Sequence, residues 1–84
     1  MNELASPFTR NISAFDKSTG AFVESFDIDI PLQELQRIIV PYSNDPYMIM
    51  QYDVDLRISE FLRSYTDRLF YFDLYDYEMG AYAS

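Results

Sequence analysis

Apolar and polar side chains alternate near the start of the chain, as they do in β-strands. Three apolar side chains between residues 8 and 14 share one parity, and Arg10 interrupts their row. Residues 16–20 (Asp-Lys-Ser-Thr-Gly) favour a turn, because Asp can hydrogen-bond the local backbone and Gly tolerates a positive φ. Alternation resumes over residues 21–28, with Glu24 as an exception. This pattern predicts an amino-terminal β-hairpin.

Helical spacing replaces alternation after Pro31, a residue that suits the first turn of a helix. Apolar residues over 32–39 recur at helical intervals, and Pro41 ends this short helix. A second and longer apolar face predicts a helix from about Val54 to Thr66. Asp53 precedes it as the expected N-cap. Between the two helices we expect a loop and then a short extended segment over residues 48–52.

The most aromatic stretch of the chain runs from Leu69 to Glu78, and we predict that it is a central strand. One row of alternate residues is expected to face the helices: Phe70, Phe72 and Leu74. The opposite row is expected to face away from them: Tyr71, Asp73, Tyr75 and Tyr77. Gly80 is expected to mark the end of the strand.

The order of elements is therefore strand, strand, helix, short extended piece, helix, strand, or ββα(β)αβ. The fold class that fits this order is α+β. We expect a small antiparallel sheet with an N-terminal β-hairpin and two helices packed on one face. The last strand could pair with either strand of the hairpin. All 84 residues are expected to form a single domain, residues 1–84.

Charge narrows the classes of partner. Six basic and fourteen acidic side chains give a net charge of −8, which disfavours direct binding to nucleic acid or to an anionic membrane surface. A cationic protein partner is favoured instead, although negative charge also simply keeps a small protein in solution. The first residues lack the pattern of a signal peptide, and no apolar run reaches membrane-spanning length. We therefore expect a cytoplasmic protein.

Candidate chemistry is sparse. The chain contains no histidine and no cysteine, which removes the commonest general base and the thiolate metal ligands. Pairs of carboxylates occur at Asp27 and Asp29, Asp53 and Asp55, and Asp73 and Asp76. None of these pairs comes with a glycine-rich loop, a nucleophile motif or a calcium-loop pattern. We expect no enzyme activity, no catalytic residues, no metal site and no cofactor.

The opposite row of the predicted strand is the best candidate for a partner-binding surface. Its members lie roughly 6.5–7 Å apart along a strand, where tyrosine can anchor an interface and a carboxylate can meet Arg or Lys. The candidate partner-binding residues are Tyr71, Asp73, Tyr75, Asp76, Tyr77 and Glu78. The alternative is that some of these tyrosines fill the core.

Three stretches carry a resemblance to a known group of proteins: residues 15–20 (Phe-Asp-Lys-Ser-Thr-Gly), 29–32 (Asp-Ile-Pro-Leu) and 71–77 (Tyr-Phe-Asp-Leu-Tyr-Asp-Tyr). Together they resemble small bacterial domains found among the immunity proteins of contact-dependent growth inhibition and bacteriocin systems. The likeness covers about residues 13–78. It implies a small cytoplasmic inhibitor that occludes a cognate toxin, and it transfers no binding residues.

These observations lead to one hypothesis and two alternatives. The hypothesis is an immunity protein that forms a 1:1 complex with a basic, nuclease-like toxin domain, with an RNase favoured over a DNase, through its acidic, tyrosine-rich surface. One alternative is a nucleic-acid mimic that inhibits a DNA-binding protein. The other is a structural homodimerisation domain.

Overall fold

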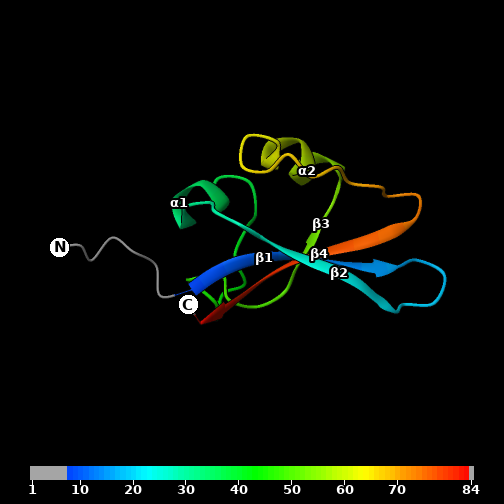
Figure 1. Ribbon diagram of the computed structural model, residues 1–84. Helices are drawn as coiled ribbons and strands as arrows, with labels where there is room; N and C mark the ends of the chain where they lie inside the picture. Colours follow the sequence, from blue (N-terminus) through cyan, green and yellow to red (C-terminus); the bar gives the residue numbers. More distant parts are fainter. Residues whose placement is uncertain (1–7, 84) are drawn as a thin grey trace.

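A four-stranded antiparallel sheet forms the body of the protein, and both helices lie on one side of it (Figure 1). The computed structural model describes residues 8–83. The elements follow the order β1 (Phe8–Asp16), β2 (Phe22–Ile28), α1 (Leu32–Leu35), β3 (Tyr52–Val54), α2 (Leu56–Leu62) and β4 (Tyr75–Ala83). The α+β class, the order ββα(β)αβ and the placement of both helices on one face are therefore confirmed.

The strands lie side by side in the order β2-β1-β4-β3. The sequence left open which hairpin strand receives the last strand, and the structure assigns it to β1. The two strands pair over their whole length, from Phe8 opposite Ala83 to Asp16 opposite Tyr75. β4 is therefore an inner strand, and the three-residue β3 forms the edge beyond it. The opposite edge is β2.

The predicted hairpin is confirmed. The carboxylate of Asp16 accepts hydrogen bonds from the backbone N–H groups of Ser18 at 2.8 Å and Thr19 at 3.0 Å. Gly20 adopts a φ of +77°, which is unfavourable for other residues. Arg10 interrupts the apolar row of β1, but it stays on the covered face with the residues of that row. Its side chain is buried between the sheet and the loop that follows α1.

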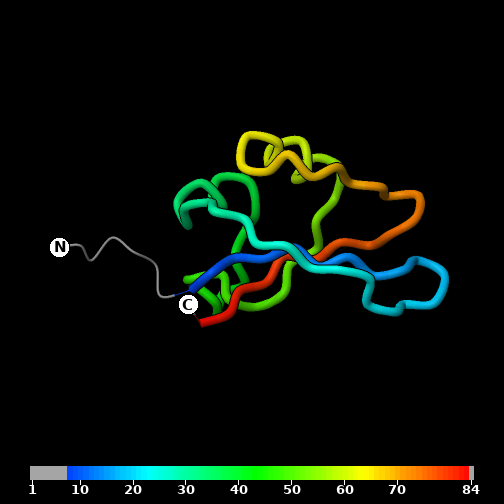
Figure 2. The backbone as a smooth tube through the Cα atoms, in the orientation of Figure 1, coloured from blue at the N-terminus to red at the C-terminus, as the bar shows by residue number. Residues whose placement is uncertain are grey.

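The predicted bounds of the last strand were wrong. Residues 66–74 form an irregular segment that ends in a turn, in which the N–H groups of Leu74 and Tyr75 donate to the carbonyl of Tyr71. The segment carries the chain from the end of α2 to the far end of the sheet (Figure 2). Pairing starts only at Tyr75 because β1 ends opposite it, at Asp16. Gly80 lies inside β4.

This shift reverses the two rows expected for the strand. Tyr77 and Met79 are buried in the core, whereas Asp76 is exposed on the other face of β4. Leu74, which was expected in the core, is exposed in the turn. Phe70 and Phe72 do pack against the core, but they do so from the irregular segment.

Both helices are shorter than predicted. α1 has four residues and continues as turns. α2 starts at Leu56 because Val54, its expected first residue, pairs with β4 as part of β3. The N-cap is Asp55 and not Asp53, and the Asp55 carboxylate accepts a hydrogen bond from the Ile58 N–H at 2.8 Å. Of the extended segment expected over residues 48–52, only Tyr52 lies in a strand.

The core fills the space between the sheet and the helices. Its fully buried side chains come from both layers, including Ile12 in β1, Leu35 in α1 and Leu62 in α2. Tyr77 joins them from β4 and is contacted edge-on by the rings of Phe70 and Phe72. Only one face of the sheet is used in this way, which leaves the other face for the site described next.

Candidate functional site: the open face of the sheet

The sheet face that points away from the helices carries mostly polar side chains, with Phe15 and Phe22 at its hairpin end. Strand pairing fixes its membership, because residues directly opposite one another point to the same face. We call this surface the open face, and its side chains are Thr9, Asn11, Ser13, Phe15, Phe22, Ser25, Asp27, Asp53, Asp76, Glu78 and Tyr82.

One row of the open face crosses all four strands. Asp53 in β3 lies opposite Glu78 in β4, Glu78 lies opposite Ser13 in β1, and Ser13 lies opposite Ser25 in β2. Side chains that are directly opposite on neighbouring strands have Cβ atoms about 5 Å apart. The row therefore places two carboxylates beside each other at its β3 end and two hydroxyl groups at its β2 end.

No basic side chain in the described part of the chain pairs with Asp53 or Glu78. Within residues 8–83, neither carboxylate has a hydrogen bond or an ion pair. The six basic side chains of the protein are used elsewhere. Four form ion pairs, Arg10 is buried on the other side of the sheet, and Arg57 donates to the Ile38 carbonyl at 2.9 Å.

The other two acidic groups of the open face have partners. Asp76 forms an ion pair with Lys17 at 2.8 Å. Asp27 accepts hydrogen bonds from the hydroxyl of Tyr82 at 2.8 Å, across the intervening strand β1. This hydrogen bond, more than its partial burial, raises the pKa of Tyr82, because it favours the neutral phenol beside a carboxylate.

The structure separates the six candidate partner-binding residues into three groups. Asp76 and Glu78 lie on the open face. Tyr75 and Tyr77 point toward the helices, and Tyr77 is 5% exposed, so they act as core residues. Tyr71 and Asp73 lie in the segment before β4. The single row expected from alternation is therefore not present.

Asp27, Asp53 and Tyr82 were not among the candidates, although each adds an acidic or phenolic group to the open face. Asp27 belongs to the polar parity of the second hairpin strand, which is the signal that could have identified it. Asp53 was assigned to a helix cap because the short strand β3 gave no recognisable alternation. Tyr82 lies beyond Gly80, where the strand was expected to have ended.

A second feature is the loop between α1 and β3, which is organised by buried polar groups. The carboxylate of Asp45 accepts hydrogen bonds from the N–H groups of Ile49 and Met50 at 2.9 Å and from the hydroxyl of Tyr52 at 2.8 Å. Arg10 donates to the carbonyls of Tyr47 and Met48. These contacts fix the backbone of the loop against β1 and β3.

The same contacts shift the pKa values of the buried groups. Burial lowers the pKa of Arg10, and the Asp45 carboxylate opposes part of that shift. For Asp45, burial alone would raise the pKa, but the hydrogen bonds from Ile49, Met50 and Tyr52 outweigh it, so the pKa lies below its ordinary value. Burial raises the pKa of Tyr52. Asp45 is therefore held as a charged acceptor inside the loop.

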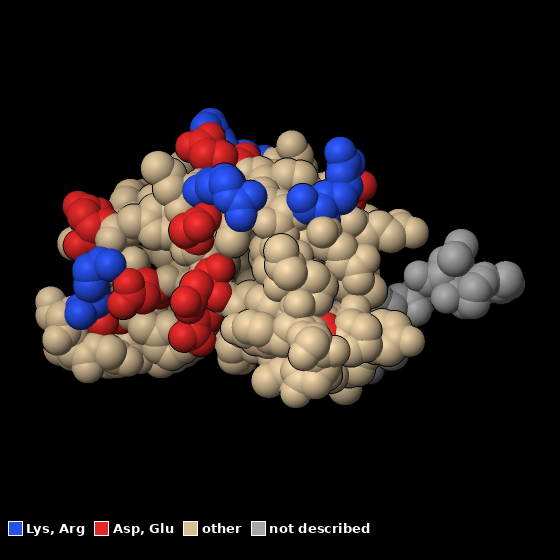
Figure 3. All heavy atoms as spheres, turned by 180° about the vertical axis from the view of Figure 1, so that it is seen from behind, with Lys and Arg blue, Asp and Glu red and all other residues tan. Residues whose placement is uncertain are grey.

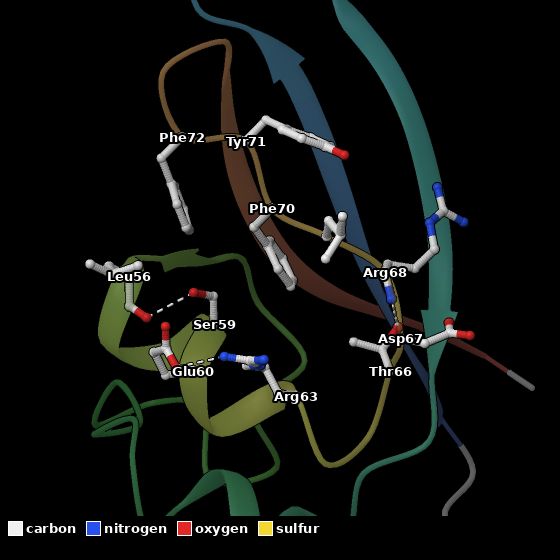
Figure 4. Close-up of a pocket in the computed structure, with 11 residues that line it drawn as sticks. Leu56, Ser59, Glu60, Arg63, Thr66, Asp67, Arg68, Phe70, Tyr71 and Phe72 are labelled. Atoms are coloured by element: carbon white, nitrogen blue, oxygen red, sulfur yellow. Dashed lines mark hydrogen bonds and ion pairs between the residues drawn. The ribbon is translucent and has the colours of Figure 1, made fainter.

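A groove of about 470 Å³ lies between α2 and the segment that follows it. Phe70 and Phe72 point toward α2, whereas Tyr71 points away (Figure 4). Four charged side chains line the groove: Glu60, Arg63, Asp67 and Arg68. Glu60 and Arg63 pair with each other at 3.3 Å, and Arg68 pairs with Glu24. The groove contains no set of groups arranged for acid–base or nucleophilic chemistry.

Within the part of the chain that the structure describes, no group of three or more acidic, histidine or cysteine side chains is placed to hold a metal ion. In that same part, no helix is long and apolar enough to cross a membrane.

The fold and the open face define a small α+β domain whose antiparallel sheet is covered on one side only. The chain belongs to the family described as a domain of unknown function, DUF7683, whose model matches residues 9–80. No curated protein and no solved structure matches the chain.

Proposed function

We propose that the protein is an immunity-type inhibitor that binds a basic toxin domain through the open face. The observation that carries this proposal is the pair of carboxylates Asp53 and Glu78, which lie opposite each other. No basic side chain of the described residues pairs with either, because all six are engaged elsewhere. Like charges directly opposite on neighbouring strands destabilise a sheet. A basic partner that inserted an Arg or Lys between them would remove that cost.

The class of toxin follows from charge. A nuclease domain must hold phosphates, so its active-site surface is basic, and an acidic surface is its electrostatic complement. The net charge of −8 adds long-range attraction that speeds encounter with such a partner. Between the two classes of nuclease, we favour an RNase over a DNase as the target. Tyr82, which is 46% exposed, gives the open face an aromatic side chain of the kind that anchors interfaces.

Co-expression with a toxin tests this function. The gene next to that of this protein is first read for a nuclease toxin domain. If it encodes one, that domain is produced from an inducible promoter in cells that do or do not produce the protein. We expect the wild-type chain to restore growth. The double variant Asp53→Asn/Glu78→Gln is expected to restore it poorly, because it removes both unpaired charges and retains side chains of the same shape.

A matched control removes the same amount of charge from outside the open face. Asp29→Asn/Asp73→Asn changes two exposed carboxylates, neither of which belongs to the sheet. This control should protect cells as well as the wild type. The proposal fails if no toxin domain is encoded beside the gene, if the wild type gives no protection, or if both double variants protect equally.

A further inference from the structure

The loop between α1 and β3 displays an unusual number of large apolar side chains to solvent. We call these five side chains the loop patch, and their exposed fractions are Val40 87%, Tyr42 48%, Tyr47 64%, Ile49 42% and Met50 46%. The loop lies at the end of the molecule that also holds the last residues of β4 (Figures 1 and 2). Single exposed apolar residues are ordinary, but five within eleven positions call for an explanation.

The loop patch is held in place and cannot simply fold back onto the core. Asp45 binds the backbone of Ile49 and Met50, and Arg10 binds the carbonyls of Tyr47 and Met48. Met48 itself is buried with a φ of +54°, a conformation that costs free energy for a non-glycine residue. A surface fixed in this way loses little conformational entropy on binding.

The loop patch is also uncharged. Between residues 38 and 52 the only side chain that is charged at neutral pH is Asp45, which is 3% exposed and accepts hydrogen bonds inside the loop. Viewed from behind, acidic side chains gather over one half of the molecule, and the lower part of the other half is almost free of charge (Figure 3). Two copies of a chain with a net charge of −8 repel each other wherever their acidic surfaces meet. The loop patch is a surface where they can meet without that cost.

The size of the loop patch suits a weak to moderate interaction. About half of the full area of five large side chains is on the order of 500 Å², which is near the upper end of the largest apolar patch on a typical monomer. Stable complexes bury about 800 Å² on each partner. We propose that two copies of this chain associate through the loop patch, placing the same uncharged surface of each copy against the other in a symmetric dimer.

Analytical ultracentrifugation of the full chain between about 10 μM and 1 mM tests this proposal. The weight-average mass should rise with concentration from 9.9 kDa toward twice that value. The variant Tyr47→Ser/Met50→Ser should raise the dissociation constant of the dimer at least about tenfold. Circular dichroism should show an unchanged fold, because both side chains point to solvent and the backbone contacts remain.

Two control variants distinguish the loop patch from other apolar surfaces. Leu69→Ser changes a side chain that is 70% exposed beside the groove, and Phe22→Ser changes one that is 61% exposed on the edge strand β2. Both should dimerise like the wild type. The proposal is overturned if the wild type is monomeric at 1 mM, or if either control weakens the dimer as much as Tyr47→Ser/Met50→Ser does.

Salt gives an independent test. Because the interface is apolar and the chains carry like charge, the dissociation constant of the dimer should stay constant or fall as salt rises from about 50 to 500 mM. Weakening by salt would contradict the proposal, since it would indicate a contact between opposite charges. Asp53→Asn/Glu78→Gln should dimerise like the wild type. The proposal of a dimer is therefore tested separately from the proposal of toxin binding.

Discussion

The two faces of β4 differ in the burial and the charge of their side chains. Tyr77 and Met79 are buried against the helices, whereas Asp76 and Glu78, which alternate with them, lie on the open face. Tyr77 and Met79 pack against the hydrophobic core. Asp76 is paired with Lys17, whereas no basic side chain of the described residues pairs with Glu78. One face of the strand therefore contributes to the core, and the other carries acidic side chains to which we propose that a partner binds.

The largest expected effect on stability comes from truncating a residue on the buried face of β4. Tyr77→Ala should lower the free energy of unfolding by about 3–5 kcal/mol, because it leaves a cavity beneath the rings that contact Tyr77. Asp76→Ala, one position away, should cost less than about 1 kcal/mol, since its ion pair with Lys17 is exposed. Urea titration measures both values. Similar losses in the two variants would contradict the division between the faces.

A smaller loss is expected from the polar part of the covered side. Asp45→Asn should lower the midpoint of urea unfolding at neutral pH, because an amide cannot replace a carboxylate that accepts from Ile49, Met50 and Tyr52. The backbone of the loop should lose protection from hydrogen exchange, whereas β1 should keep it. An unchanged unfolding midpoint would show that the loop does not depend on this carboxylate.

Asp45 also makes the stability of the protein depend on pH. The pKa of Asp45 is lower in the folded protein than the value of about 3.9 in an unfolded chain. Its contribution to stability is therefore complete above about pH 4 and is lost as pH falls through the folded-state pKa. Between pH 5 and about pH 2, the wild type should lose more stability than Asp45→Asn loses. Parallel curves would contradict this account.

The smallest expected effect has the opposite sign and belongs to the open face. Glu78→Gln should raise the free energy of unfolding by a few tenths of a kcal/mol, because it relieves repulsion with Asp53. The gain should shrink as salt screens the pair. Glu60→Gln is the matched control, since Glu60 is paired with Arg63, and it should give no gain. A loss of stability in Glu78→Gln would mean that this carboxylate has a structural role.

Local sequence patterns predicted the fold well where two strands that are consecutive in the sequence pair with each other. The hairpin could be read from alternation and its turn from Asp16 and Gly20, because both signals are local. The last strand could not be bounded in the same way, since its start depends on where β1 ends, a contact between residues about sixty positions apart. Aromatic residues over 69–74 have a high β-propensity but pack on the core from an irregular segment.

Only part of the candidate site could be predicted, because local patterns do not show which strands pair. Asp76 and Glu78 could be recognised because they interrupt an apolar pattern, and both lie on the open face. Tyr75 and Tyr77 could not be placed correctly, since a one-residue change of parity moves every side chain of a strand to the other face. Asp53 becomes part of the site only through its pairing with β4, which no local pattern of three residues indicates.

The central claim is that the unpaired acidic charge of the open face recruits a basic partner. Stopped-flow association with the toxin domain that the growth-protection experiment identifies tests it most directly, with wild type and Asp53→Asn/Glu78→Gln compared at about 50 and 500 mM salt. We predict that the wild-type rate falls at least about tenfold as salt rises, and that the variant associates more slowly at low salt with a weaker dependence. Equal rates and equal salt dependence for the two proteins would contradict the claim.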